Sequence, residues 1–460
     1  MKQYDAIVIG SGSGTNIVAA ALKHDWKVAL LDKGPVGGTC ANLGCIPSKL
    51  LIYPADRILD IRESAKLGIN AELRDIDFTG IMERMRHSVR ETHDSIVDGV
   101  HHTKNLEFYD GEAHFVDSRT IEVNGENIKS NKIFIASGSR PLIPPIKGLD
   151  VVSYLTSESL LQLNKQPESM IIIGGGYIAV EYGHFFEAMG TKVTILEMAD
   201  RLILAEEPEI AALLKEELSK RMVVETGKTV TGVKSIDGNI VVNTNDKAGN
   251  QQEFSARSLL VAAGRKSNAD LLKLENAGIA VNERGFIKVN EFMETTVKNI
   301  WAVGDINGIQ MFTHAANREA SIAGHNTVHG AKIKIDLSAT PHAVFSHPQI
   351  ASVGLTEEQA RKDHKILVGK AKYLDTAKGE AMMEEKGFAK VIVEKETNKI
   401  LGFHIIGPEA PTLIQEVINA MSSGGDYGPI NAGMHIHPAM PELIARAFDS
   451  IEDAEASQPG

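Results

Sequence analysis

The chain has 460 residues, a length that allows two to four domains with buried cores. Hydrophobic residues make up 43% and charged residues 23%, as in an ordinary globular protein, and the net charge of −12 argues against nonspecific nucleic-acid binding. No apolar run reaches the roughly 18 residues of a membrane helix, and Asp5 interrupts the N-terminal apolar stretch, so that we expect a cytosolic protein with no signal peptide.

The first predicted element is a strand over Ala6–Ile9, which runs into the turn GSGSGT at residues 10–15. A helical stretch and a second strand ending at Asp32 follow, which is the order of a dinucleotide-binding βαβ unit. Asp32 lies 20 residues after Gly12, where its carboxylate can accept a hydrogen bond from an adenosine ribose. Thr15 occupies the third glycine position of the motif beside Gly14, so we expect the helix to pack on the strand more loosely or in a displaced position.

Both cysteines, Cys40 and Cys45, lie in the segment GGTCANLGCIPSK. On a regular helix they would point about 140° apart, so a bond between them requires a bend, which the flanking glycines permit. Such a small ring is easily reduced. If a helix follows, Lys49 would share a face with Cys45, where its ammonium would favour negative charge nearby, of a thiolate or of a reduced cofactor. A zinc half-site completed by histidines and two incidental buried thiols are the less favoured alternatives.

A second βαβ unit begins at Met170 with MIIIGGGYIAVEYGHFFEAMG and ends in TKVTILE, at Glu197. The turn carries the G-x-G-x-x-A pattern. A carboxylate at Glu197 accepts from a free 2′-hydroxyl and repels a 2′-phosphate, which favours NAD over NADP, although Arg201 lies close enough to keep NADP open. Glycine-rich bends without a ligand are the alternative, and the presence of two complete units weakens it.

These segments resemble the flavin-dependent pyridine nucleotide-disulfide oxidoreductases, with GGTCANLGCIPSK as the redox-active disulfide. Further similar segments are IFIASGSRP at 133–141, LLVAAGRKSN at 259–268, TTVKNIWAVGDI at 295–306 and TPHAVFSHPQIASVGLTEEQA at 340–360. The resemblance implies that Cys45 lies beside the flavin and that Cys40 exchanges with substrate. It also implies a Lys49–Glu181 ion pair near the reactive nitrogen of the flavin.

The resemblance implies two cofactors, FAD and NAD, and no metal. The residues implied for FAD are Gly10, Gly12, Gly14, Asp32, Lys49, Ser137, Gly138, Gly304 and Asp305. The residues implied for NAD are Gly174, Gly176, Tyr177, Ala179, Glu197 and Gly264. Among these, Asp305 would bind the ribityl chain and Tyr177 would line the nicotinamide pocket.

The segment MHIHPAMPELIARAF is similar to the His-Pro-x-x-x-Glu catalytic motif of the family, which implies these roles for His437 and Glu442. Imidazole can move a proton between thiols near neutral pH, and a carboxylate can orient it. In the family this pair reaches into the active site of the partner subunit, so the resemblance implies an obligate homodimer. His435 is expected to be structural.

Within the family, GCIPSK and GGGYIAVE look most like dihydrolipoyl dehydrogenases. That likeness implies oxidation of dihydrolipoamide with NAD, and 2-oxo-acid dehydrogenase complex components as partners. Pro441 and the GSGSGT turn instead resemble mycothiol disulfide reductases, so an NAD(P)H-dependent reductase of low-molecular-weight disulfides is the alternative. A non-catalytic flavin-binding sensor or scaffold is less favoured, because the cysteines and the base are present.

The predicted fold class is α/β, with two Rossmann-like domains for FAD and NAD and an α+β C-terminal dimerisation domain. The FAD-binding domain is expected at 1–140 and 265–335, with the NAD-binding domain at 141–264 inserted between its parts. The dimerisation domain is expected at 336–460. We also expect a hairpin tip within 244–254 and a frayed acidic tail at 450–460.

Overall fold

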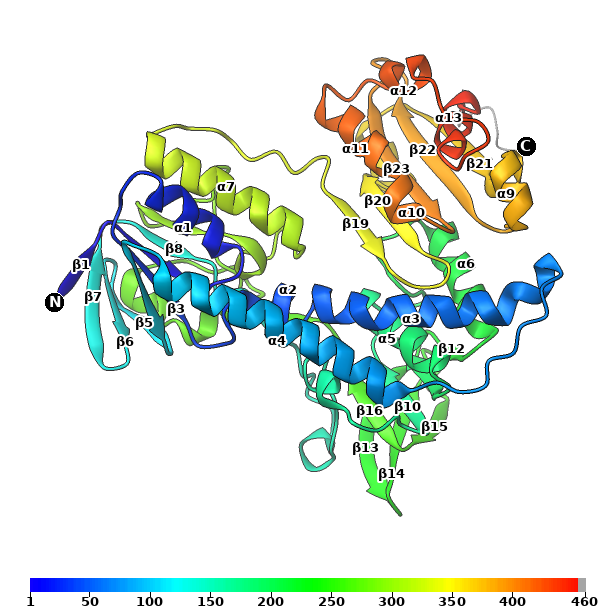
Figure 1. The fold of residues 1–460 in the computed structure, drawn as a ribbon, viewed down its shortest axis with the longest axis horizontal. Coiled ribbons are helices and arrows are strands. Elements are labelled where there is room, and N and C mark those ends of the chain that lie inside the picture. The colour runs from blue at the N-terminus through cyan, green and yellow to red at the C-terminus, as the bar shows by residue number, and fades with distance from the viewer. Residues whose placement is uncertain (454–460) are drawn as a thin grey trace.

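Two parallel sheets and one antiparallel sheet organise the computed structural model, which describes residues 1–453 (Figure 1). The predicted fold class is confirmed: two Rossmann-like units precede a separate C-terminal α+β unit. None of the helices within residues 1–453 is both long and apolar enough to span a membrane.

The first sheet has five parallel strands in the order β18-β8-β2-β3-β4. Its strands are β2 (Ala6–Ile9), β3 (Val28–Asp32), β4 (Leu106–Asp110), β8 (Ile133–Ile135) and β18 (Ile300–Ala302). Side chains alternate between its faces. Ala6 and Val8 join the core under helices α1 (Gly14–Leu22) and α7 (Thr313–His329), whereas Ile7 and Ile9 face the opposite core. Both cores are apolar, so the sheet is covered on each face.

Small β-elements complete this part of the molecule. One sheet has the order β1-β7-β6-β5, and a two-stranded ladder joins β9 to β17. Their bounds are β1 (Lys2–Tyr4), β5 (Ala113–Asp117), β6 (Thr120–Val123), β7 (Glu126–Ser130), β9 (Ser139–Pro141) and β17 (Arg265–Ser267).

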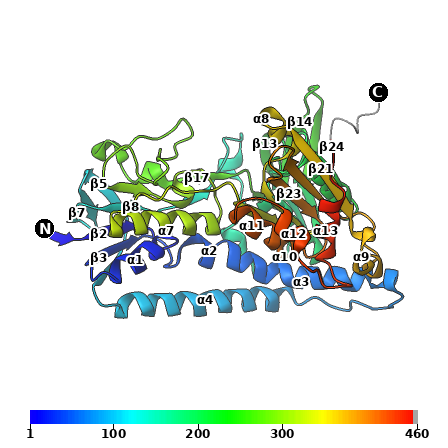
Figure 2. The same cartoon turned by 90° about the horizontal axis from the view of Figure 1, so that it is seen from above.

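Three helices between β3 and β4 carry the cysteines and their surroundings: α2 (Gly38–Asn42), α3 (Cys45–Glu63) and α4 (Phe78–His102). Helices α3 and α4 run side by side (Figure 2). Cys40 lies on α2 and Cys45 is the first residue of α3, and only a short connection separates the two helices. The 140° separation expected on one regular helix therefore does not apply to them.

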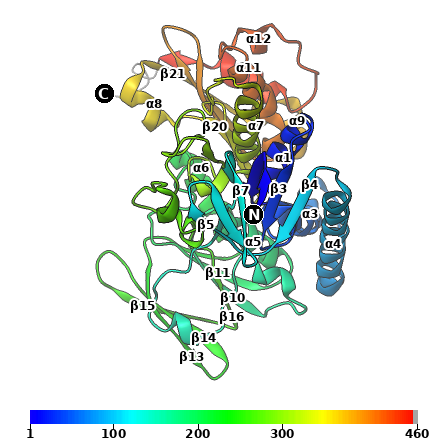
Figure 3. The ribbon, with the colours of Figure 1, turned by 90° about the vertical axis from the view of Figure 1, so that its left-hand side faces the viewer.

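The second parallel sheet, in the order β12-β11-β10-β16, lies in the sequence between β8 and β18 of the first. Its elements are β10 (Ser169–Ile173), α5 (Tyr177–Ala188), β11 (Lys192–Leu196), α6 (Pro208–Ser219), β12 (Val223–Glu225) and β16 (Ser258–Val261). An antiparallel sheet of β13 (Thr229–Ile236), β14 (Asn239–Asn245) and β15 (Gln251–Ala256) projects from it (Figure 3). The β14–β15 turn confirms the predicted hairpin tip.

The C-terminal unit is a six-stranded antiparallel sheet in the order β19-β20-β23-β22-β21-β24. Its strands are β19 (Pro341–Val344), β20 (Ile350–Gly354), β21 (Ile366–Lys372), β22 (Phe388–Glu394), β23 (Ile400–Ile406) and β24 (Glu452–Asp453). Its helices are α8 (Glu357–Asp363), α9 (Ala377–Met382), α10 (Ala410–Leu413), α11 (Gln415–Ser422), α12 (Gly428–Ala432) and α13 (Glu442–Asp449). The prediction of a frayed tail is wrong for residues 452–453, because they form β24, which pairs with β21. The part of that prediction that covers 454–460 lies outside the described residues.

Candidate active site

The cysteine segment lies over the first glycine turn. Gly38, the first residue of α2, approaches so closely that a Cβ added there would lie 2.7 Å from the Cα of Gly12. Cys40 is half-buried on α2, Cys45 is exposed at the start of α3, and both are free thiols. The redox-active segment therefore covers part of the first dinucleotide-binding unit.

The two sulfurs differ in protonation. A hydrogen bond from the Cys40 thiol lowers the pKa of Cys45 to about 5, and the Thr313 hydroxyl, 3.5 Å from Cys45 Sγ, and the Lys49 charge act in the same direction against burial. The same sulfur–sulfur hydrogen bond, together with burial, raises the pKa of Cys40 far above its usual range. These shifts favour the thiolate at Cys45 and the protonated thiol at Cys40.

An ion pair joins the helix of Cys45 to the second βαβ unit. Lys49 Nζ donates to Glu181 Oε2 of α5 at 2.7 Å and lies 4.5 Å from the centroid of the Phe345 ring. Burial raises the pKa of Glu181, although Lys49 and the backbone N–H of Phe345 (3.0 Å to Oε1) stabilise the charged carboxylate. The predicted Lys49–Glu181 contact is present and brings three parts of the chain together beside Cys45.

The predicted residue Asp32 closes the first glycine turn. Its Oδ2 accepts from the backbone N–H (2.7 Å) and the hydroxyl (2.5 Å) of Ser11, and its Oδ1 accepts from Gly34 N (3.0 Å). A Cβ at Gly10 would overlap the carbonyl oxygen of Ala136. A Cβ at Gly14 would lie 2.8 Å from Val8 Cγ1, so Gly14 gives the close approach of helix to strand that the motif assigns to the third glycine. The packing is displaced by one residue and is not loose.

Asp305 lies in the short turn that follows β18. The Ser139 hydroxyl donates to Asp305 Oδ2 at 2.5 Å, and Arg265 Nε donates to that hydroxyl at 2.7 Å. The predicted residue Ser137 has a buried hydroxyl with no hydrogen-bond partner in the described part of the chain, and Gly138 follows it in an open position. A buried hydroxyl without a partner next to the turn is what a site for a polar ligand requires.

Glu319 was missed by the sequence reasoning. Its Oε2 accepts from the backbone N–H of Gly304 (2.6 Å) and from Asn307 Nδ2 (2.7 Å), on either side of Asp305. The side chain is completely buried, and burial raises its pKa to about 7. Nothing in a single sequence distinguishes this glutamate from other helical glutamates, and Thr313 and Arg265 were missed for the same reason.

The second glycine turn is more open. A Cβ at Gly174 would overlap the Ala262 carbonyl oxygen, whereas a Cβ at Gly176 would meet nothing within 4 Å. Ala179 is buried in α5, and Gly264 leaves space at the end of β16. Glu197 follows β11 and accepts from Ala199 N at 2.7 Å.

Two further residues lie near this turn in the sequence: Tyr177 and Arg201. Tyr177 begins α5, burial raises its pKa to about 12, and its ring contacts that of Phe312 at 6.1 Å between centroids. Arg201 donates from Nη2 to the carbonyl oxygen of Leu204 at 3.2 Å, within its own loop. The turn therefore has an acidic residue, Glu197, at its edge and an aromatic residue, Tyr177, at its helix start.

The predicted base lies in the C-terminal unit. His437 Nδ1 is 2.9 Å from Glu442 Oε1, and Ala439 N donates to Glu442 Oε2 at 3.1 Å. These hydrogen bonds hold the pKa of Glu442 below its usual value. The His437 side chain is 72% exposed, and within residues 1–453 no hydrogen bond joins it to either cysteine. His435 pairs with Glu416 at 3.2 Å.

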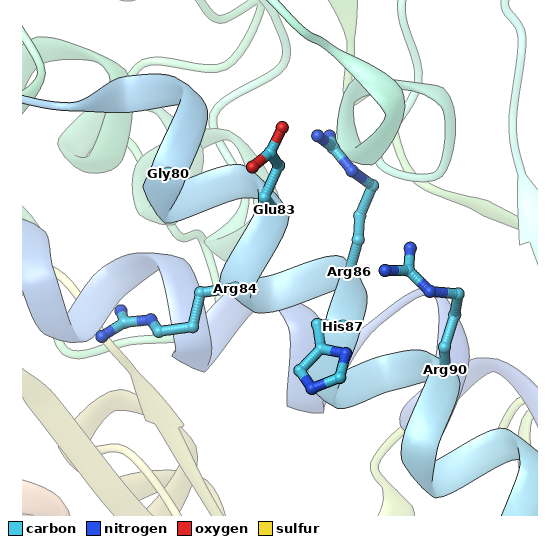
Figure 4. Close-up of a pocket in the computed structure, with 6 residues that line it drawn as sticks. All are labelled: Gly80, Glu83, Arg84, Arg86, His87 and Arg90. Carbon is cyan, nitrogen blue, oxygen red and sulfur yellow. The ribbon is translucent and has the colours of Figure 1, made fainter.

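An open depression on α4 is separate from these residues (Figure 4). It is lined by Gly80, Glu83, Arg84, Arg86, His87 and Arg90. Arg86 donates to the carbonyl oxygens of Leu161 and Leu163 (3.3 and 3.1 Å), and Arg84 donates to that of Leu50 (3.4 Å). These arginines thus hold α4 against its neighbours.

Comparison with known proteins decides the family. The model described as pyridine nucleotide-disulphide oxidoreductase matches residues 4–320, and that of the dimerisation domain of the same family matches residues 340–448. The chain belongs to this family. Pyridine nucleotide-disulphide oxidoreductases are flavoproteins that use FAD and a nicotinamide dinucleotide, and the chain is an enzyme of this kind with the domain that forms homodimers.

Several relatives within this oxidoreductase family are similarly close. The chain is 37% identical over 454 residues to a dihydrolipoyl dehydrogenase of Geobacillus stearothermophilus, covering 97% of this chain and 95% of the relative. It is 34% identical over 461 residues to a mycothione reductase of Mycobacterium tuberculosis, with coverages of 97% and 99%. The solved HOCl-induced flavoprotein disulfide reductase RclA from Escherichia coli, as its Cu(II) complex, superposes with a TM-score of 0.86 at 30% identity, with coverages of 98% and 99%. The likeness identifies the chemistry but does not select one disulfide.

Proposed function

We propose that the enzyme is a cytosolic, NAD-linked dihydrolipoyl dehydrogenase that works through a Cys40–Cys45 disulfide. The observation that carries this proposal is the thiol pair itself: Cys40 on α2 and Cys45 at the start of α3 are free thiols on adjacent helices, and the Cys40 hydrogen bond and the Lys49 charge both lower the pKa of Cys45. The 37% identity to a dihydrolipoyl dehydrogenase supports the choice of substrate. Glu197, at the edge of the second turn, supports NAD.

The proposed reaction begins with thiol–disulfide exchange between the substrate and the Cys40–Cys45 disulfide. A substrate dithiol loses two electrons and closes its S–S bond, while the Cys40–Cys45 bond breaks and both sulfurs are reduced. Cys40 exchanges with the substrate, and His437 of the partner subunit takes the proton that the attacking thiol loses. Glu442 holds the imidazole by the 2.9 Å contact with Nδ1, which leaves Nε2 free to take the proton. The net reaction converts dihydrolipoamide and NAD to lipoamide, NADH and a proton.

FAD, when bound, would supply the two-electron redox chemistry that links Cys45 to NAD. The unpartnered Ser137 hydroxyl and the turn at Gly10 fit this cofactor. The residues proposed to hold FAD are Gly10, Gly12, Gly14, Asp32, Lys49, Ser137, Gly138, Gly304 and Asp305. Those proposed for NAD are Gly174, Gly176, Tyr177, Ala179, Glu197 and Gly264. Lys49 and Glu181 hold charge beside the Cys45 sulfur, while Tyr177 lines the nicotinamide side.

We also propose the division into domains that the sequence predicts, with FAD bound by residues 1–140 and 265–335, NAD by 141–264, and the dimer contact made by residues from 336 onward. Components of a 2-oxo-acid dehydrogenase complex would be the partners of such an enzyme. Copurification of the chain with a lipoyl-bearing acyltransferase from its native cells is the measurement that checks this.

The direct test is an anaerobic assay of NAD reduction by dihydrolipoamide, run beside NADH oxidation by the disulfides of mycothiol and glutathione and by other small disulfides. The proposal expects dihydrolipoamide to have the highest kcat/KM. A larger kcat/KM for a mycothiol-type disulfide would favour the second candidate, which Pro441 at the start of α13 and the 34% identity to a mycothione reductase support.

The role of His437 across the dimer has its own test. His437→Ala should slow dithiol oxidation by about 10²–10⁴-fold, because a positioned base contributes that much. Mixing Cys45→Ser chains with His437→Ala chains should restore about a quarter of wild-type activity, since each heterodimer has one site with both lesions and one with neither. No recovery after verified exchange of subunits would mean that His437 serves its own subunit or is not the base.

A further inference from the structure

Three aromatic rings from two parts of the fold stack beside the cysteines. The Phe312 ring lies parallel to that of His314 (5.6 Å between centroids, 7° between planes) and to that of His342 in β19 (5.7 Å, 9°). His314 Nε2 donates to the carbonyl oxygen of Pro341 at 2.6 Å, which ties the start of α7 to β19. The stack therefore begins next to Thr313, the residue whose hydroxyl meets Cys45.

His342 is fixed at its other edge by a buried carboxylate. Its Nε2 lies 2.5 Å from Glu206 Oε1, and Ser352 donates to Glu206 Oε2 at 2.5 Å. Glu206 is 2% exposed; burial alone would raise its pKa, but the hydrogen bonds of His342 and Ser352 lower it, so the carboxylate is charged. Glu206 belongs to the loop before α6, so this pair joins the C-terminal sheet to the second βαβ unit.

Two routes lead from His342 to the second glycine turn. One follows the loop: Glu206 N donates to Ile203 O (2.9 Å), and Ile203 N donates to Gly175 O (2.8 Å). The other passes through the rings, from His342 to Phe312 and from Phe312 to Tyr177 at the start of α5. Both end at the turn that would bind the nicotinamide dinucleotide.

We propose that His342 is a positioning residue for the nicotinamide pocket. The His342 ring stacks on Phe312, and its hydrogen bond to Glu206 fixes the imidazole to the loop before α6. This arrangement keeps Phe312 in contact with Tyr177. The inference rests on the proposed role of Tyr177. The dithiol side should depend on His342 less, because Cys40 and Lys49 act on Cys45 in addition to Thr313, the neighbour of Phe312.

Three substitutions separate the ring from its hydrogen bond. His342→Ala removes both, His342→Phe keeps a ring that can stack on Phe312, and His342→Gln keeps a donor for Glu206 without the ring. In stopped-flow experiments on the FAD-loaded dimer, loss of flavin absorbance with NADH should slow about tenfold in the alanine variant, because small misplacements of a reacting group have effects of this order. The phenylalanine variant should be the fastest of the three. Reduction by dihydrolipoamide should change less than about twofold in all three.

His364→Ala is the matched control, because His364 Nδ1 pairs with Glu394 (2.7 Å) in the same sheet without touching Phe312. It should match the wild type in both half-reactions. If NADH fails to bleach the wild-type flavin, the proposed function is wrong. If the wild type reacts and the variants equal it, or if both half-reactions slow equally, the inference on His342 is wrong. Should the alanine variant not fold, a glutamine variant faster than the phenylalanine variant overturns the inference.

Discussion

The two glycine turns share one motif and differ in what covers them. Over the first turn, Gly38 of α2 lies within contact of Gly12, and Asp32 accepts two hydrogen bonds from Ser11 of the turn and one from Gly34. Over the second turn, a Cβ at Gly176 would meet nothing within 4 Å, and Met198, next to Glu197, is 68% exposed.

This difference corresponds to what each turn has to do in a pyridine nucleotide-disulphide oxidoreductase. A resident cofactor benefits from a lid, because its release then requires the covering segment to move. A dinucleotide that exchanges in every turnover needs an open edge. The segment that covers the first turn also carries Cys40 and Cys45, so under the proposed function the same α2–α3 connection would cover the flavin and present the sulfurs.

The largest effect is expected from Gly38→Ala, which should displace the segment that covers the first turn. Its Cβ would lie 2.7 Å from Gly12 Cα, and its φ of 69° disfavours any side chain, so the covering segment must move. A strain of about 3 kcal/mol would weaken FAD binding about 100-fold. Flavin retained after gel filtration and the dissociation constant from flavin fluorescence measure the effect. The matched variant Gly176→Ala has open space and a φ of −77° and should keep its FAD; equal flavin loss in both would contradict the comparison.

The open turn should select its dinucleotide by charge. We expect the wild type to prefer NADH over NADPH by about 100-fold in kcat/KM, and Glu197→Gln, which removes the charge but keeps an acceptor, to reduce that preference to about tenfold. Asp32→Asn is the control and should leave the ratio unchanged. Comparable use of both dinucleotides by the wild type would point to Arg201 as a phosphate ligand.

The segment that covers the first turn should contain a cysteine, Cys45, with a low pKa. Because Cys40 lowers the pKa of Cys45 to about 5, Cys45 is protonated below that pH and a thiolate above it, whereas an ordinary cysteine has a pKa near 9.0. Alkylation of the reduced enzyme at Cys45, followed by mass spectrometry, should therefore show a midpoint near pH 5. At pH 7 the rate should stay within about threefold of that of an ordinary thiol, because the lower nucleophilicity of a low-pKa thiolate offsets its larger ionised fraction. Lys49→Met should raise the midpoint, whereas Gly176→Ala should not; a midpoint above pH 8 in the wild type would refute the assignment.

The smallest effect concerns helix packing in the first turn. Gly14→Ala places a Cβ 2.8 Å from Val8 Cγ1 and should destabilise the protein by about 1–3 kcal/mol. Thr15→Ala removes only a hydroxyl that donates to Gly12 O (2.8 Å) and should cost about 1 kcal/mol or less. Thermal unfolding of both variants compares the two losses of stability. A larger loss of stability in Thr15→Ala than in Gly14→Ala would mean that position 15, and not Gly14, fills the role of the third glycine.

Much of the architecture follows from local patterns. Two strand–glycine–helix segments, each followed by a strand with an acidic end, predicted both βαβ units, because backbone contacts within about 30 residues produce that unit. The spacing of His437 and Glu442 suits the contact that the structure shows, since these residues are only five apart. The sequence placed the two cysteines near each other, but it did not reveal that they lie on two helices.

Other features depend on contacts that only the folded chain makes. Lys49 meets Glu181 across 132 positions, Cys45 meets Thr313 across 268, and His342 meets Glu206 across 136. Which sulfur is the thiolate is decided by such neighbours, because a pKa responds to charges and hydrogen bonds within a few ångströms whatever their distance in sequence. The sequence by itself determined the two nucleotide-binding units and the chemistry of the cysteine pair. The tertiary structure decided which turn is covered, which cysteine is ionised and which side chains surround them, because these depend on how separate elements pack in space.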